Sequence, residues 1–90
     1  MVKYFVKFSK QALKDQKLLK QAGLEKTTKG LLNIIKDNPF QNPPYYEKLR
    51  GNFHSFYSRR INLKHRLVYK VNDKKKEVII LSMWSHYEKL

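Results

Sequence analysis

Few side chains in this chain are candidates for a general acid or a general base. Glu47 and His86 are candidate proton carriers, and Tyr87 follows His86. The cations that could stabilise a developing negative charge near them are Arg50, Arg59, Arg60 and Arg66. Metal-free RNA cleavage needs little more, because the 2′-hydroxyl is itself the nucleophile and the protein supplies a base, an acid and cations. This set is permissive and would also fit many basic domains.

Most of these arginines lie in one stretch, Tyr57 to Val71, which reads YSRRINLKHRLVYKV. It predicts two strands joined by a tight polar turn. Arginines on rigid strands suit phosphate, because the planar guanidinium offers a fixed fork of donors. Arg59 and Arg60 point to opposite faces of their strand. We therefore expect Arg60 to meet RNA and Arg59 to serve packing or the rim of the site.

Other chemistries lack the residues they need. There are no cysteines, which excludes disulfides and cysteine-based metal sites. The histidines have no ligand spacing and no carboxylates cluster, so we expect neither a metal nor a cofactor. The three separated glycines form no phosphate loop, and a Ser–His–Asp arrangement stays open without a nucleophile elbow to support it. His65 is expected to shape the hairpin turn, and His54 to lie on the surface.

The charge balance is strongly basic. Twenty Lys and Arg face seven Asp and Glu over 90 residues, a net charge of +13. That is the footprint of a protein that meets a polyanion, although a lysine-rich proteome would produce it too. The N-terminus lacks an apolar signal region, and no segment approaches the roughly 20 apolar residues of a membrane span. We expect one cytoplasmic domain, 1–90, without a membrane partner.

The N-terminal part predicts one strand and two helices. Residues 2–8 alternate, and Phe5 on the otherwise polar face predicts that both faces are partly covered. Ser9 is the expected N-cap of a helix that runs to about Gln21. A second helix spans about Leu24 to Lys36, with apolar residues at spacings of three and four.

The remainder predicts a connector followed by strands. Residues 37–46 hold all three prolines and predict an ordered connector. Residues 47–54 leave open one short strand around Leu49, before the hairpin strands 56–63 and 66–72. The apolar run 78–84 predicts a buried central strand. The order β-α-α-β-β-β indicates an α+β fold, with two N-terminal helices packed on one face of a mostly antiparallel sheet of four or five strands.

Four motifs occur in an order that resembles one known family. They are EKLR at 47–50, YSRRI at 57–61, HRLVY at 65–69 and HY at 86–87. In order and separation they resemble the Txe/YoeB branch of the RelE toxin superfamily, over nearly the whole chain. The resemblance implies a RelE-like fold and the toxin of a type II toxin–antitoxin pair. It also implies a metal-independent, ribosome-dependent endoribonuclease, an mRNA interferase that cuts mRNA in the ribosomal A site.

The resemblance further implies a role for each matched residue. Glu47 matches the general base, and Arg66 the arginine that stabilises the phosphate. His86 matches the general acid, and Tyr87 the C-terminal tyrosine beside it. The further residues expected to bind RNA or phosphate are Arg50, Arg60, Arg59 and Lys48.

The sequence departs from the family pattern at two places in the chain. The loop before Glu47 reads PPYYEKL, and three residues, 88–90, follow the terminal HY. These departures leave open a noncatalytic RNA-, DNA- or partner-binding module on the same fold. Such a module would bind with a steep salt dependence and yield no cut product.

The partners implied by the resemblance are macromolecules. They are the ribosome and mRNA, together with an acidic antitoxin of the YefM/Axe kind that covers the C-terminal end. Operator DNA is expected to be bound only by the toxin–antitoxin complex. A homodimer is plausible from the aromatic content, and Trp84 is a candidate for core packing or a dimer contact.

Overall fold

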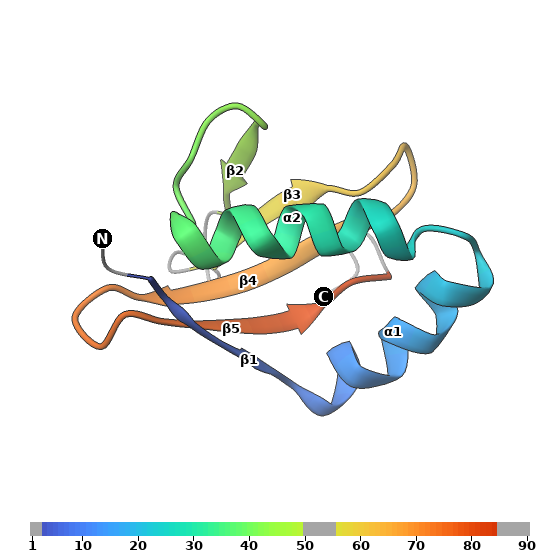
Figure 1. Cartoon of the computed structure of the whole chain (residues 1–90), viewed down its shortest axis with the longest axis horizontal. Helices are drawn as coiled ribbons and strands as arrows, with labels where there is room; N and C mark the ends of the chain where they lie inside the picture. The colour runs from blue at the N-terminus through green and yellow to red at the C-terminus, as the bar shows by residue number, and fades with distance from the viewer. Residues whose placement is uncertain (1–2, 50–55, 85–90) are drawn as a thin grey trace.

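The computed structural model describes residues 3–49 and 56–84 of the chain. Within these ranges the elements follow the expected order: β1 (Phe5–Phe8), α1 (Lys10–Gln21), α2 (Glu25–Asp37), β2 (Tyr46–Lys48), β3 (Phe56–Arg60), β4 (Arg66–Asn72) and β5 (Glu77–Ser82). The strands form one sheet in the order β1-β5-β4-β3-β2. Only the β1–β5 pair is parallel among these strands. The predicted α+β fold with a mostly antiparallel sheet is confirmed (Figure 1).

Local signals set the limits of the helices. The Ser9 hydroxyl accepts a hydrogen bond from the Ala12 amide at 3.0 Å, which caps α1 as predicted. Gly23 follows α1 with a φ of 74°, a left-handed conformation that glycine adopts without a Cβ clash. In the second helix, Thr28, Leu31 and Ile35 are buried at spacings of three and four. The chain therefore turns back twice and brings both helices to the sheet.

The hydrophobic core lies between the helices and one face of the sheet. Leu19, Leu31 and Ile35 of the helices meet buried residues of β4 and β5, among them Tyr69 and Ile80. Figure 1 shows α2 crossing the sheet over β3 and β4, while α1 packs beside β5 and β1. The opposite face of the sheet carries the alternate residues of each strand. No helix in the described ranges is long and apolar enough to cross a membrane.

Two local expectations differ from the structure. The strand around Leu49 is instead β2, Tyr46–Lys48, and Leu49 lies directly after it, 5% exposed. Phe5 is 63% exposed, so the face of β1 that carries it is mostly open, where the sequence predicted that both faces are partly covered. The reason is topological: β1 is an edge strand that pairs only with β5, and the helices cover one face of the sheet. The run after Val78 is an interior strand, as predicted, because β5 lies between β1 and β4.

Candidate functional site

One pocket brings together the predicted base and two predicted cations. It has a volume of about 330 Å³ and opens on the sheet face away from the helices. Its lining residues are Pro44, Tyr45, Glu47, Ser58, Arg60 and Arg66. Glu47 pairs with Ser58 between β2 and β3, and Arg60 pairs with Arg66 between β3 and β4. The register of β2, β3 and β4 therefore brings residues of three separate sequence motifs to one pocket.

The strand pairing gives this pocket its charge pattern. Arg60 and Arg66 stand directly opposite each other on neighbouring strands. Like charges in that position repel, and an anion bound between the two guanidinium groups would relieve this repulsion. Arg60 is exposed and Arg66 half-buried, which leaves the pocket open to a ligand on one side. Two guanidinium groups and one carboxylate in the same pocket suit a phosphodiester whose neighbouring hydroxyl loses a proton.

Ser58 is a pocket residue that sequence reasoning missed. Its side chain is 1% exposed, and its hydroxyl has no hydrogen-bond partner among the described residues. A buried hydroxyl without a partner is uncommon, because it forfeits hydrogen bonds to water. The signal was available: Ser58 is two residues before Arg60, so the alternation of the strand places both side chains on one face.

Arg59 has a different position from Arg60, as the alternation predicted. It is 1% exposed on the helix-covered face, where its guanidinium donates hydrogen bonds to protein oxygens. The expected packing role agrees with this position. Its place among the RNA-binding residues is a correction, because a guanidinium enclosed by the protein's own carbonyls presents no donor to RNA.

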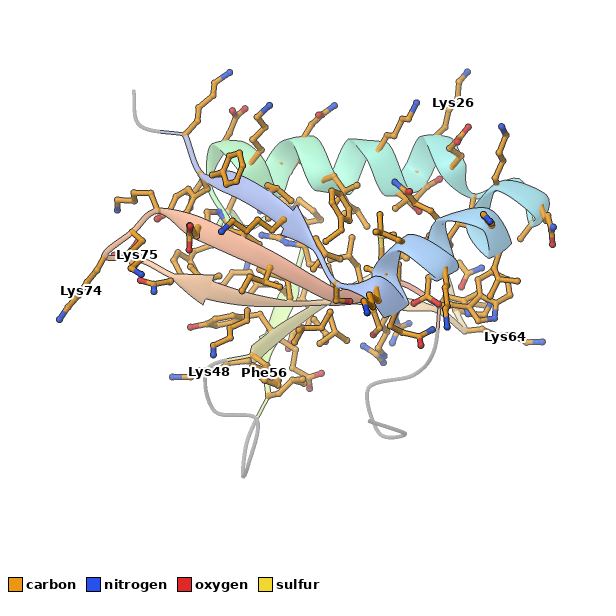
Figure 2. The ribbon with its side chains drawn as sticks, turned by 90° about the horizontal axis from the view of Figure 1, so that it is seen from below. Lys26, Lys48, Phe56, Lys64, Lys74 and Lys75 are labelled. Carbon is orange, nitrogen blue, oxygen red and sulfur yellow. The ribbon has the colours of Figure 1, made fainter. Side chains whose placement is uncertain are left out.

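The other predicted residues fall into two groups. Lys48 is exposed but pairs with Tyr57, on the opposite face from Glu47, so it does not line the pocket (Figure 2). Arg50, His86 and Tyr87 lie outside the described residues, as do His54 and residues 88–90. The altered loop before Glu47 forms one wall of the pocket through Pro44 and Tyr45, and Tyr45 is 70% exposed.

The segment that leads toward His86 is held from two directions. The Asp15 carboxylate accepts a hydrogen bond from the Met83 amide at 2.9 Å. The His65 ring stacks on Trp84 with centroids 3.9 Å apart, and its Nδ1 contacts the Trp84 carbonyl. His65 also donates its amide to Asn62 in the hairpin turn, so its predicted turn role agrees with the structure. Met83 and Trp84, the last described residues, are therefore anchored to α1 and to the turn that precedes β4.

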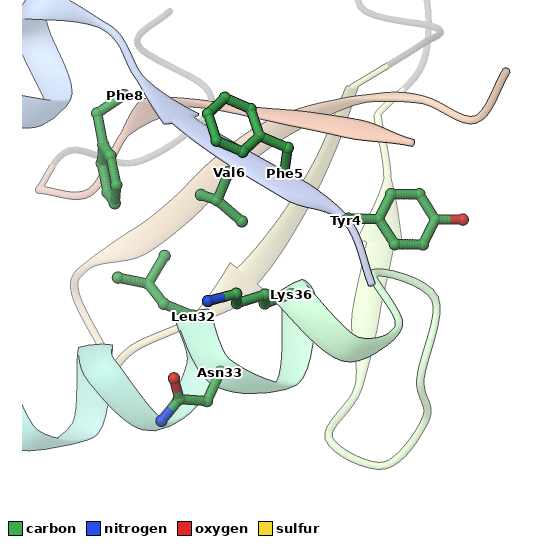
Figure 3. A pocket seen from close by; sticks show the side chains of 7 residues that line it. All are labelled: Tyr4, Phe5, Val6, Phe8, Leu32, Asn33 and Lys36. Atoms are coloured by element: carbon green, nitrogen blue, oxygen red, sulfur yellow. The ribbon is translucent and has the colours of Figure 1, made fainter. Parts of the chain in front are cut away.

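A second pocket lies between β1 and α2 and offers little chemistry. The pocket has a volume of about 280 Å³. Figure 3 shows its lining residues, most of which are apolar: Tyr4, Phe5, Val6, Phe8, Leu32, Asn33 and Lys36. It holds no carboxylate or histidine. Across the described ranges, no group of three or more His, Cys, Asp or Glu could hold a metal ion.

Comparison with known proteins places the motifs in a family context. Residues 8–87 match the family model described as YoeB-like toxin of bacterial type II toxin-antitoxin system. The chain is 37% identical over 75 residues to Toxin YoeB of Synechocystis sp., covering 83% of this chain and 78% of that protein. It resembles the Staphylococcus aureus YoeB dimer with a TM-score of 0.79, 37% identity, and coverage of 96% and 100%. The toxin chain of the YoeB-YefM complex from that organism gives 0.77, with the same identity and coverage.

Proposed function

The chain belongs to the YoeB-like toxin family of bacterial type II toxin–antitoxin systems, and from this premise we propose that it is an endoribonuclease that cuts mRNA in the ribosomal A site without a metal. The observation that carries the proposal is the pocket that Glu47, Arg60 and Arg66 line together. Attack by a 2′-hydroxyl requires a base and cations that bind the phosphate. The carboxylate and the two guanidinium groups can supply these.

The proposed reaction divides the work among five residues. Glu47 takes the proton of the 2′-hydroxyl, whose oxygen attacks the adjacent phosphorus. Arg66 and Arg60 stabilise the extra negative charge of the phosphorane. The bond to the 5′-oxygen breaks as His86, helped by Tyr87, donates a proton to it. The products are a 2′,3′-cyclic phosphate, which can open to a 3′-phosphate, and a 5′-hydroxyl.

The test is primer extension on a reporter mRNA in a purified translation system, with and without ribosomes. Discrete cuts on translated message alone support the full proposal. Cuts on naked RNA as well would keep the chemistry but remove the ribosome from the mechanism. Absence of cuts in both cases would overturn the nuclease proposal in favour of the noncatalytic binding module.

Variants separate this chemistry from simple RNA binding. Glu47→Gln, Arg66→Ala and His86→Ala should each lower the cleavage rate by about 100-fold or more. Lys74→Ala is the matched control, since Lys74 is exposed in the β4–β5 turn and does not line the pocket (Figure 2). Full activity in all three of these variants would refute the assignment of the catalytic residues.

The antitoxin partner follows from the same premise. YoeB of S. aureus occurs as a dimer and in a complex with YefM. We propose an acidic antitoxin for this chain, because a net charge of +13 attracts an acidic partner over a long range. Raising the salt concentration should then lower the association rate constant by a larger factor than it changes the dissociation rate constant.

A further inference from the structure

Arg59 is the largest fully buried side chain among the described residues, and it is held by neutral groups. Its Nε donates to the Tyr69 hydroxyl at 3.1 Å, and its Nη1 to the Pro44 carbonyl at 2.8 Å. Its Nη2 donates to the Pro39 and Gln41 carbonyls at 3.0 and 2.9 Å. Burial of a cation is costly in free energy unless its donors are satisfied. These four oxygens offset the cost of burying the Arg59 guanidinium.

Three of the four acceptors belong to a single segment without regular structure. Residues 38–45 connect α2 to β2 and contain the three prolines, which have no amide donor. Arg59 donates hydrogen bonds to carbonyls near both ends of this segment, those of Pro39 and Pro44. The Tyr69 hydroxyl adds a further bond, donating to the Pro39 carbonyl at 2.7 Å. The guanidinium therefore donates to carbonyls of this segment, as backbone amides donate to carbonyls in helices and sheets.

The same segment determines where Glu47 lies. The Pro44 carbonyl accepts a hydrogen bond from Arg59, and Pro44 also lines the pocket. Tyr46 pairs with Arg59 across β2 and β3, and the Arg59 guanidinium carbon lies 5.1 Å from the Tyr46 ring centroid. Glu47 is the next residue and points to the other face. Because β2 has three residues at the edge of the sheet, its own ladder bonds give Glu47 little support.

We propose that Arg59 is a positioning residue for the cleavage reaction: it holds the 38–45 segment and β2 so that the Glu47 carboxylate stays in reach of the 2′-hydroxyl. This inference rests on the proposed function of Glu47. Arg59 acts from the opposite face of the sheet and touches no substrate. A displacement of about 1 Å at a catalytic group can cost about 100-fold in rate, so a loosened β2 is enough to impair the reaction.

The test compares the rate constant at saturating substrate with KM for three variants, on the RNA substrate that the wild-type protein cuts. Arg59→Lys keeps the charge, but a single ammonium cannot reach all four acceptors. We expect its kcat to fall by about 10- to 100-fold while KM changes by less than about 3-fold. Tyr69→Phe removes one of these partners and should lower kcat by about 3- to 10-fold.

Leu19→Ala is the control for a general loss of stability, because Leu19 is 1% exposed and packs between α1 and α2. All proteins are assayed at a temperature where circular dichroism shows each to be folded, and Leu19→Ala should retain kcat within about 3-fold. If Arg59→Lys does not fold, Tyr69→Phe carries the test. Wild-type kcat in every folded Arg59 and Tyr69 variant, or an equal loss in Leu19→Ala, overturns the inference. Full activity in Glu47→Gln would instead overturn the proposed role of Glu47 as the base, on which this inference rests.

Discussion

The buried hydroxyl of Tyr69 predicts a loss of stability at alkaline pH that one substitution removes. Tyr69 is fully buried, donates to the Pro39 carbonyl and accepts from Arg59. Burial raises the pKa of Tyr69 from 10.0 to about 12, and the neighbouring Arg59 only partly opposes this rise. The folded protein therefore holds this proton more tightly than the unfolded chain does.

The sign and the size of the effect follow from proton linkage. Stability from Tyr69 is fully present below pH 10 and is lost as the pH rises from 10 to about 12. The difference between these pKa values corresponds to a loss of about 3 kcal/mol. Tyr69→Phe cannot lose a proton, but it leaves the Arg59 Nε–H and the Pro39 carbonyl without this partner. We expect that to cost about 1–3 kcal/mol at pH 8.

The assay is urea unfolding followed by far-ultraviolet circular dichroism, from pH 8 to 11.5, for the wild type and Tyr69→Phe. Lysine titration is common to both proteins and cancels in the difference between their unfolding free energies. That difference should be constant up to about pH 9.5 and then shrink toward zero or change sign. Parallel stability curves over the whole range would refute the reasoning, as would an absorbance titration in which Tyr69 ionises near pH 10.

Three other substitutions test the fold at separate points. Asp15→Ala should destabilise the protein by about 1–3 kcal/mol in urea unfolding, because the buried Met83 amide loses its acceptor; a change below about 0.5 kcal/mol would contradict this. Gly23→Ala should cost about 1 kcal/mol, since φ is 74° there. Gly30→Ala should stabilise by about 0.5–1 kcal/mol, because the added Cβ meets open space inside α2. Equal effects at the two glycines would show that backbone conformation is not the cause.

The elements of the fold were largely predictable because their signals are local. The Ser9 hydroxyl caps α1 through an amide three residues away, and Gly23 ends that helix through its own φ. Alternation along β3 separated Arg59 from Arg60 without knowledge of any other strand. Such features depend on neighbours within one or two turns, and those neighbours are fixed by chain connectivity.

The candidate site was predictable only as a set of residue types. Motif order associated Glu47 with Arg66, but their meeting depends on β2 pairing with β3 and β3 with β4. Alternation places Ser58 on the same face as Arg60, but Ser58 lies beside Glu47 only through the pairing of β2 with β3. Register is a long-range property, because a shift by one residue would send every side chain of a strand to the other face.

The sequence by itself determined the charge of +13, the absence of cysteine, the N-cap of α1 and which residues of a strand share a face. The tertiary structure alone decided that Phe5 is exposed, because β1 is an edge strand. It also decided that Arg59 is enclosed by carbonyls 15 to 20 residues away in the chain. The physical reason is the same in both cases: burial and hydrogen bonding depend on which distant segments meet, and local sequence patterns do not encode that.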